Sequence, residues 1–320
     1  MHHPSVSFIV PCKNGAASIR HCIASLQDLT CGDDEIIVVD NGSTDGTFAI
    51  ASSFEGTRVI ESAAVTIAAV RNDGARRAHG DWLAFVDCDT VLATDWRDHL
   101  QRVFRDDHVV ATGSGPHLSP NPTWVEKAWL CGSEGRAGPA EYVWSGNLIV
   151  RGEAFRRLNG FCEDLETDED TDFCWRITKR FGEKSLAHAP HMKAAHLGNS
   201  KTLKQFWIRQ YWHASGMLSS AGKHGLDKAL VMTIAFALLN LFAVGWFLTR
   251  PTPLDSLISA SSILLVPALT ALYRMRASEC ARWAPQLVLL YTLFYYARTA
   301  RAFRDSIIRF WTLKKNTGRG

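Results

Sequence analysis

The 320-residue chain has little of what marks a small secreted domain. Its eight cysteines stand at unrelated spacings and include no CxxC pair. Disulfide frameworks are typical of short secreted chains and structural zinc sites need clustered ligands, so we expect reduced thiols and no zinc site. Residues 1–7 are polar, and the apolar run Phe8–Val10 is too short for the core of a signal peptide. We therefore expect the N-terminal part to lie in the cytoplasm.

Charge is scarce in two respects. The 35 lysines and arginines nearly balance 32 acids, and a net charge of +3 does not favour a nucleic-acid partner. Charge is also missing from two long runs in the last third, Leu230–Leu248 and Ser256–Tyr273. Each run approaches the length of a helix that crosses a bilayer, and Pro267 is tolerated in such a helix. The sequence therefore predicts membrane spans at about 230–248 and 256–273.

A third apolar run, Ala284–Ala297, is shorter and leads into a basic tail. Two spans return the chain to the side of the N-terminal domain, whereas a third full span would place the basic tail outside. The positive-inside rule disfavours that alternative, so we expect a re-entrant or interfacial helix over about 284–312. The predicted division is a cytoplasmic domain over residues 1–225 and a membrane region over residues 226–320.

The N-terminal part alternates short apolar runs with helical periods. Runs rich in β-branched residues suit strands buried on both faces, and their alternation with helices predicts an α/β fold with a mainly parallel sheet. The expected strands are Val6–Pro11, Glu35–Asp40, Arg58–Ile60 and Trp82–Val86, and the expected helices between them are Ala17–Leu29 and Ala63–Ala78. Ligands bind beyond the carboxyl ends of parallel strands, so Asp40 and Asp87 fall on the ligand side.

The strand ending at Val86 is followed directly by Asp87-Cys88-Asp89. Two carboxylates one residue apart at a strand end can share a hard divalent cation such as Mg²⁺ or Mn²⁺, which also binds phosphate oxygens. The alternative is a pair of solvated turn aspartates, which is the commoner meaning of such a pattern. Position at the ligand edge favours the metal site.

A second acidic group opens a predicted helix over 168–180. Asp168 can cap this helix, and one acid in the first turn interacts favourably with the helix dipole. Capping does not explain five acids within seven residues, because they repel one another unless a cation or a substrate proton is near. The five are Glu166, Asp168, Glu169, Asp170 and Asp172.

Several motifs occur together in a fixed order, and the ordered set resembles the family 2 glycosyltransferases of the GT-A fold over roughly residues 5–200. The motifs are Phe8–Asn14, Ile37–Thr47, Arg71–Ala75, Gly80–Asp89, Ser145–Asn147, Asn159–Phe161 and Glu169–Arg176. The segment before Asp170 is about one residue shorter than in many relatives, and Asn14 stands where the family often has glutamate.

The resemblance implies a role for each matching position. It places Pro11, Asn14, Asp40, Arg71 and Asp87 around the nucleotide. It implies metal ligation by Asp87 and Asp89, with His196 either completing the site or serving as a polar loop residue. Asp170 is the expected general base with Glu169 beside it, and Gly146 and Asn147 are expected near the sugar and acceptor.

The implied activity is an inverting, metal-dependent transfer of a sugar from a nucleotide-diphosphate donor to a hydroxyl group. The membrane runs favour a lipid-linked or envelope glycan acceptor at the inner membrane, with no nucleic-acid partner. A nucleotidyltransferase would need a glycine-rich loop after the first strand, and Pro11–Ala17 does not provide one. A non-catalytic scaffold that binds nucleotide sugars remains the alternative, although it would not need to keep Asp89 and Asp170.

Overall fold

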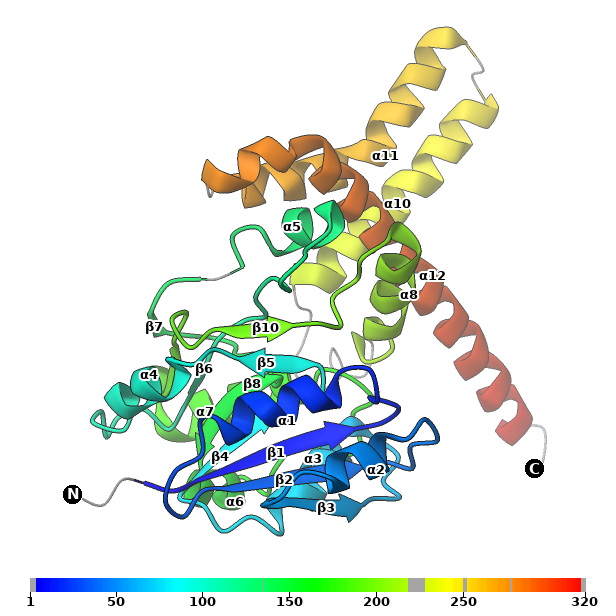
Figure 1. The fold of residues 1–320 in the computed structure, drawn as a ribbon. Coiled ribbons are helices and arrows are strands. Elements are labelled where there is room, and N and C mark those ends of the chain that lie inside the picture. Colours follow the sequence, from blue (N-terminus) through cyan, green and yellow to red (C-terminus); the bar gives the residue numbers. More distant parts are fainter. Residues whose placement is uncertain (1–3, 134, 218–227, 250–251, 277, 318–320) are drawn as a thin grey trace. The chain divides into compact units, whose positions relative to one another are not determined.

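The computed structural model describes residues 4–133, 135–217, 228–249, 252–276 and 278–317 (Figure 1). The chain forms two compact units, which are treated separately below. The N-terminal unit comprises residues 1–121 and 133–199, and the C-terminal unit comprises residues 122–132 and 200–320. The boundary predicted near residue 225 falls within 218–227, outside the described residues.

The N-terminal unit is built on an eight-stranded sheet with the order β3-β2-β1-β4-β8-β6-β9-β7. These strands are β1 (Val6–Cys12), β2 (Glu35–Asp40), β3 (Thr57–Glu61), β4 (Trp82–Val86), β6 (Ala111–Gly113), β7 (Gly138–Pro139), β8 (Asn147–Arg151) and β9 (Leu186–His188). The four strands from β3 to β4 run parallel, as predicted, and β8 pairs antiparallel with β4 and β6.

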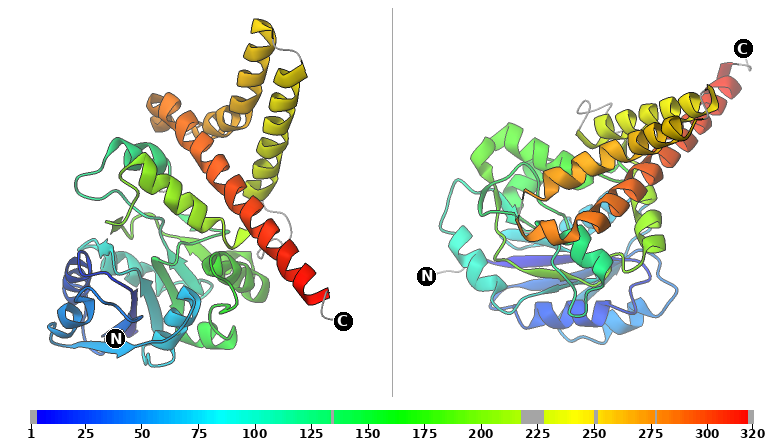
Figure 2. Two further views of the ribbon diagram at one scale, coloured as in Figure 1. Left: turned by 90° about the vertical axis from the view of Figure 1, so that its right-hand side faces the viewer. Right: turned by 90° about the horizontal axis from the view of Figure 1, so that it is seen from above.

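Helices cover both faces of this sheet (Figure 2). They are α1 (Ile19–Gln27), α2 (Thr47–Ser52), α3 (Ile67–Ala75), α4 (Trp96–Val103), α6 (Gly152–Arg157) and α7 (Glu169–Phe181). Side chains of β1 alternate between two cores, with Phe8 and Val10 packed in one and Ile9 in the other. Burial on both faces explains why the central strands are continuously apolar.

The carboxyl ends of β1, β2 and β4 meet at one edge, as the sequence predicts. Cys12 pairs with Asp40 across β1 and β2, and the N–H of Asn41 donates to the carbonyl of Cys12 at 2.8 Å. The helix after β2 has Gly46 as its N-cap, with φ at +86°. The Ser43 hydroxyl accepts instead from the N–H of Asn14 in the loop after β1.

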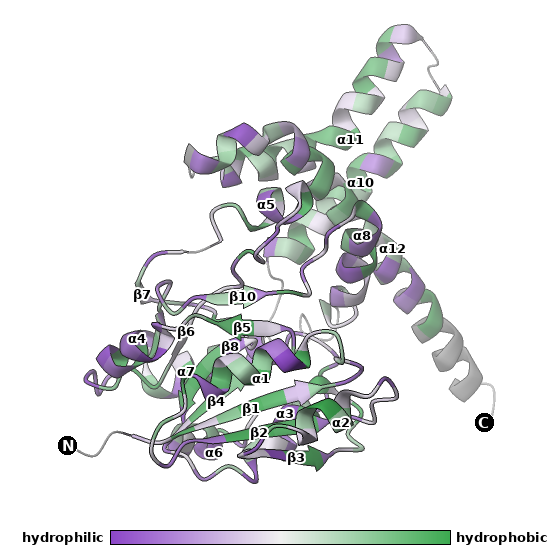
Figure 3. Ribbon diagram, in the orientation of Figure 1, coloured by the Kyte–Doolittle hydropathy of each residue, from purple (hydrophilic) through white to green (hydrophobic). Residues whose placement is uncertain are grey.

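The C-terminal unit is helical. It contains α5 (Trp124–Leu130), α8 (Leu203–His213), α10 (Lys228–Thr249), α11 (Pro253–Arg274), the short 3-10 helix η2 (Ser278–Trp283) and α12 (Ala284–Thr317). Two of these, α10 and α11, are long and apolar enough to cross a membrane, and they coincide with the two predicted runs (Figure 3). The third predicted segment forms α12, one continuous helix of 34 residues.

Polar contacts join the three long helices. The indole N–H of Trp246 in α10 donates to Asp255 of α11 at 2.8 Å, and Thr270 of α11 hydrogen-bonds to the Tyr295 hydroxyl of α12 at 2.9 Å. The Tyr296 hydroxyl donates to Asn240 of α10 at 2.6 Å. The first half of α12 is therefore fastened to both apolar helices.

The helix α5 packs with the C-terminal helices although it lies in the middle of the N-terminal sequence. Trp129 contacts Phe206 of α8 and Phe294 of α12, with ring centroids 4.7 and 5.8 Å apart. The sequence contains no sign of where this helix docks.

The expectation of reduced thiols is wrong for one pair. Cys131, after α5, forms a disulfide with Cys280 of η2, with Cα atoms 5.6 Å apart. The residues are 149 positions apart, and only the docking of α5 brings them together, so spacing could not reveal the pair. The six free cysteines are Cys12, Cys22, Cys31, Cys88, Cys162 and Cys174.

Candidate active site

Strand pairing brings the two halves of the candidate metal site together. Asp87 and Asp89 lie in the turn between β4 and β5 (Thr90–Leu92), where the N–H of Thr90 donates to the Asp87 carbonyl at 2.9 Å. β5 pairs antiparallel with β10 (Ala194–His196), with Thr90 opposite His196. The N–H of Leu197 donates to the Asp89 carbonyl at 2.7 Å, which fixes the turn against the end of β10.

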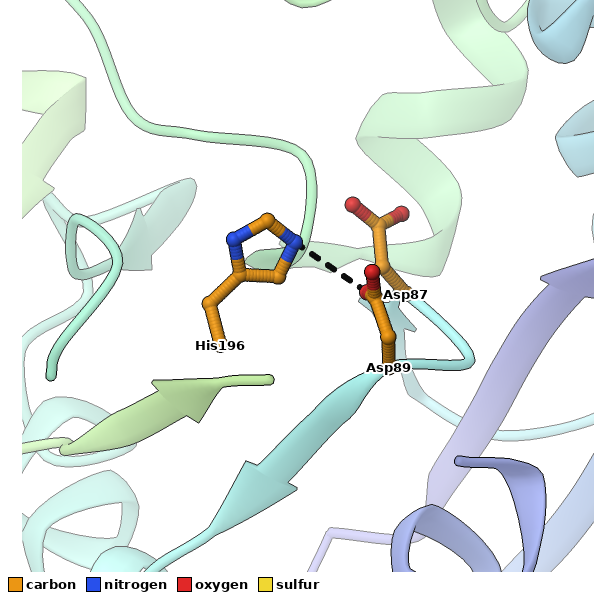
Figure 4. Close-up of side chains that lie close together, drawn as sticks. All are labelled: Asp87, Asp89 and His196. Atoms are coloured by element: carbon orange, nitrogen blue, oxygen red, sulfur yellow. Dashed lines mark ion pairs between the residues drawn. The ribbon is translucent and has the colours of Figure 1, made fainter. Parts of the chain in front are cut away.

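The side chains of Asp87, Asp89 and His196 point toward one another (Figure 4). His196 Nε2 lies 3.1 Å from Asp89 Oδ1, and ligand atoms of all three residues lie within 4.8 Å of one another. Two carboxylates and one imidazole are a donor set that suits Mn²⁺ and can also hold Mg²⁺. All three residues expected from the sequence to bind metal thus lie in one place.

The next layer of residues fixes the orientation of His196. Its Nδ1 lies 2.8 Å from Asn199 Oδ1, so the assigned amide orientation makes Nδ1 the donor of this hydrogen bond. Nε2 faces the Asp89 carboxylate at 3.1 Å, and a contact between these two atoms needs a cation or a proton between them. The arrangement fits a divalent ion.

Gly198 allows the close approach of this segment to the aspartate. A Cβ at Gly198 would lie 1.9 Å from Asp89 Oδ2, so any larger residue would displace the carboxylate. Neither Gly198 nor Asn199 is predicted by sequence reasoning. Their adjacency to His196 in His-Leu-Gly-Asn is the signal that could have found them.

Arg71 joins the metal side of the site to the acidic helix. Its Nη2 donates to Asp87 Oδ1 at 2.7 Å and its Nη1 donates to Glu169 Oε1 at 2.6 Å. Arg71 is 3 % exposed, and both carboxylates together with Asp170 raise its pKa against the opposing effect of burial. The sequence places Arg71 near the base or diphosphate, whereas the structure shows both terminal nitrogens bound to carboxylates.

The acids at the start of α7 have separate partners, which relieves the repulsion expected among them. Glu169 pairs with Arg71, and Asp172 pairs with Arg176 one turn later, with Nε and Oδ2 2.7 Å apart. Asp168 occupies the predicted N-cap position, but it adopts a left-handed conformation with φ at +68° and its side chain forms no cap hydrogen bond. Burial raises the pKa of Glu169 to about 7, although Arg71 acts to lower it.

Asp170, the expected general base, is held by three hydrogen bonds. Oδ1 accepts from the N–H of Thr171 at 2.9 Å, while Oδ2 accepts from the Tyr142 hydroxyl at 2.8 Å and the N–H of Ser145 at 3.2 Å. Two of the three donors come from the segment before β8. Sequence reasoning misses Tyr142 because the residue lies outside the motifs recognised in the sequence.

At the carboxyl ends of β1 and β2, where the nucleotide is expected, one carboxylate oxygen of Asp40 can accept a hydrogen bond from a ligand. Among the described residues, Asp40 Oδ1 is buried and has no hydrogen-bond partner, while Oδ2 accepts from the N–H of Ser43 at 3.0 Å. An unpaired buried carboxylate oxygen is costly unless a donor arrives, and a nucleobase ring N–H would supply one. Pro11 is buried in β1 opposite Val39, adjacent to this edge.

Asn14, expected to contact the nucleotide, forms hydrogen bonds to the loop that follows β2. Its Oδ1 accepts from the N–H of Thr44 at 2.9 Å, and its own N–H donates to Ser43 Oγ at 2.9 Å. The left-handed conformation of Asn14, with φ at +53°, suits asparagine. Asn14 therefore ties together the loops that follow β1 and β2.

The side chain of Asn147, a residue expected near the sugar and acceptor, is hydrogen-bonded within the core. Asn147 is fully buried, and its amide donates to Ser114 Oγ at 2.8 Å and the Met192 carbonyl at 2.9 Å while accepting from the indole of Trp96. The polar atoms of the Asn147 side chain are therefore satisfied within the core. It anchors the end of the segment that carries Gly146.

The position of the Trp144 ring leaves no room for a side chain at Gly146. A Cβ at Gly146 would lie 2.1 Å from that ring, and the ring in turn meets His196 edge-on with centroids 5.0 Å apart. The glycine thus allows an aromatic wall to form beside the candidate metal ligand.

Comparison with known proteins shows which family the N-terminal part of the chain resembles. The family model described as glycosyl transferase family 2 matches residues 7–160, which contain the Asp87-Cys88-Asp89 turn. Residues 7–160 thus match glycosyltransferase family 2. It is 26% identical over 298 residues to the pre-mycofactocin glycosyltransferase of Mycobacterium tuberculosis, an alignment that covers 87% of this chain and 59% of that protein. The chain thus spans about three fifths of the length of that relative.

Solved structures with the same fold confirm the GT-A architecture of the chain. A mannosyltransferase from Pyrobaculum calidifontis, in complex with GDP-Man and Mn²⁺, matches with a TM-score of 0.59 and 19% identity, covering 95% of this chain and 87% of that one. Residues 1–349 of TarS from S. aureus match with a TM-score of 0.50 and 16% identity, covering 94% and 92%. At such identities the likeness concerns the fold alone.

Proposed function

We propose that the chain is an inverting glycosyltransferase that moves a sugar from a nucleotide-diphosphate donor to a hydroxyl group of its acceptor. One observation carries the proposal: Arg71 binds both Asp87 and Glu169, so the candidate metal site and the acidic helix that bears Asp170 form one continuous polar site. A donor held at the metal side and an acceptor held near Asp170 would then meet.

The chemistry follows from the residues present. Asp170 takes the proton from the acceptor hydroxyl as that oxygen attacks the anomeric carbon, while the bond from this carbon to the diphosphate oxygen breaks. Asp40 Oδ1 accepts a hydrogen bond from the base, and Arg71 keeps Asp87 in position. A divalent ion held by Asp87, Asp89 and His196 would supply positive charge to the leaving diphosphate. A single displacement of this kind inverts the anomeric configuration.

The helices α10 and α11 support a membrane setting. We propose that they cross the inner membrane as a hairpin, with the N-terminal unit in the cytoplasm and α12 along the inner surface. The pairing of Cys131 with Cys280 puts η2 on the same side as α5, which a two-span hairpin requires, although disulfides are uncommon in the reducing cytoplasm. A lipid-linked or envelope glycan would then be a fitting acceptor. A reporter fused after residue 320 tests the orientation, and export of that reporter would contradict it.

Membranes containing the full chain should release a nucleoside diphosphate from one member of a panel of nucleotide sugars. Release should need Mn²⁺ or Mg²⁺ and should stop on chelation. Asp170→Asn should abolish release while leaving nucleotide binding intact, because general-base catalysis contributes about 10²–10⁴-fold. Donor binding without release by the wild type would favour the non-catalytic scaffold instead.

A further inference from the structure

The Tyr142 hydroxyl donates a hydrogen bond to Asp170, the proposed general base. Oδ1 of Asp170 is turned back toward the backbone of its own helix, where it accepts from the N–H of Thr171. Oδ2 faces the segment before β8 and accepts from the Tyr142 hydroxyl at 2.8 Å. An incoming alcohol needs this kind of position, with its oxygen about 2.6–3.2 Å from a carboxylate oxygen.

The phenol is chemically similar to an acceptor alcohol in this place. Burial of the hydroxyl raises the pKa of Tyr142 well above its ordinary value, and the charge and hydrogen bond of Asp170 raise it further. Tyr142 is therefore a neutral O–H donor throughout the physiological range. A neutral O–H that donates to the base carboxylate is also the arrangement from which an acceptor hydroxyl would react.

The surroundings of Tyr142 let the side chain move while the backbone stays. Its neighbour Val143 is buried. The N–H of Val143 donates to Cys174 Sγ at 3.4 Å, and the Cys174 thiol donates to the Val143 carbonyl at 3.6 Å. The Tyr142 residue itself is 45 % exposed although its hydroxyl points inward. Rotation of the side chain can withdraw the hydroxyl without breaking the core.

We propose that Tyr142 is a place-holder on Asp170: its hydroxyl occupies the acceptor position on Oδ2 and rotates away when the acceptor binds. The inference rests on the proposed function and adds a specific role to the site. In the absence of acceptor, the phenol keeps water off the base and so suppresses hydrolysis of the donor. The acceptor must compete with an internal hydrogen bond, which a ligand with several contacts can do and a lone water molecule cannot.

The test is release of nucleoside diphosphate from the donor, with water as the only acceptor. Tyr142→Phe keeps the ring and removes the hydroxyl, and it should hydrolyse the donor on the order of tenfold faster than the wild type, as expected when one competing hydrogen bond is lost. Tyr273→Phe, at an exposed tyrosine of the C-terminal unit, is the matched control and should hydrolyse the donor at the wild-type rate.

The double variant Tyr142→Phe with Asp170→Asn separates the place-holder from a structural effect, because its hydrolysis should be no faster than that of Asp170→Asn alone. Slower hydrolysis by Tyr142→Phe than by the wild type, with nucleotide binding unchanged, would overturn the inference and make Tyr142 a positioning residue. Hydrolysis by Tyr142→Phe no faster than by the wild type would also overturn the inference. Absence of nucleoside-diphosphate release from acceptor-containing membranes would instead overturn the proposed function, and the inference with it.

Discussion

Removing Arg71 should destabilise the N-terminal unit far more than removing an exposed arginine of the same segment. In the wild type the Arg71 guanidinium lies 2.7 Å from Asp87 and 2.6 Å from Glu169. Arg71→Ala removes this cation and leaves both carboxylates without it. Breaking a buried ion pair from one side costs about 3–5 kcal/mol, and for a domain of this size that corresponds to a fall in Tm of about 6–20 °C. Thermal unfolding of the detergent-solubilised full chain measures the change.

The pH dependence of this loss follows from Glu169. Burial raises its pKa to about 7 and Arg71 lowers it, so without Arg71 the carboxyl should hold its proton to still higher pH. The folded variant then binds more protons than the folded wild type as pH rises through about 7. The gap in unfolding free energy between the two should therefore be larger at about pH 8 than at about pH 5.

Arg76→Ala is the matched control for Arg71→Ala. Arg76 follows α3 and pairs with Asp73 and Glu163, and its side chain is 58% exposed. Exposed pairs contribute about 0–1 kcal/mol, so this variant should unfold nearly as the wild type does. If Arg71→Ala were as mild as Arg76→Ala, or equally harmful at both pH values, the buried bridge would not have the role assigned to it.

Three further variants test the surroundings of the site and the C-terminal unit. Asn199→Ala should weaken Mn²⁺ binding about 10–100-fold in a titration followed by electron paramagnetic resonance, because His196 loses its orienting partner; an unchanged Kd would refute this. Gly146→Ala should displace the Trp144 ring and cost about 1–3 kcal/mol of stability, unlike Gly245→Ala, which meets no neighbour. Alkylation and mass spectrometry of chain purified without reductant should find Cys131 linked to Cys280, and free thiols at both positions would contradict the structure. Replacing both cysteines by serine should lower the free energy of unfolding by at most about 5 kcal/mol.

The sequence specifies the parallel half of the sheet well because local signals coincide there. Glu35–Asp40 is a continuous apolar run that ends in a carboxylate, and the structure makes it β2 with the same bounds. The turn at Asp87 and Asp89 is predictable for the same reason, since a buried strand leads into it. Adjacent strands of one orientation bring such ends together without any information from distant residues.

The remaining features depend on contacts between distant parts of the chain. Asn147 belongs to a motif that suggests substrate binding. Its side-chain amide nevertheless donates hydrogen bonds to Ser114 and Met192 within the core. Tyr142 meets Asp170 only because an irregular segment crosses the start of α7. No local period or propensity encodes such meetings, and the same holds for the docking of α5 on the C-terminal helices.

The central claim is that one site holds the donor and deprotonates the acceptor through Asp170. Its most direct test compares wild type and Asp170→Asn in two assays on the same preparation, nucleoside-diphosphate binding with Mn²⁺ and release of that diphosphate from the donor. The account predicts equal binding and a loss of release of about 10²–10⁴-fold in the variant. Release by Asp170→Asn at the wild-type rate would contradict it.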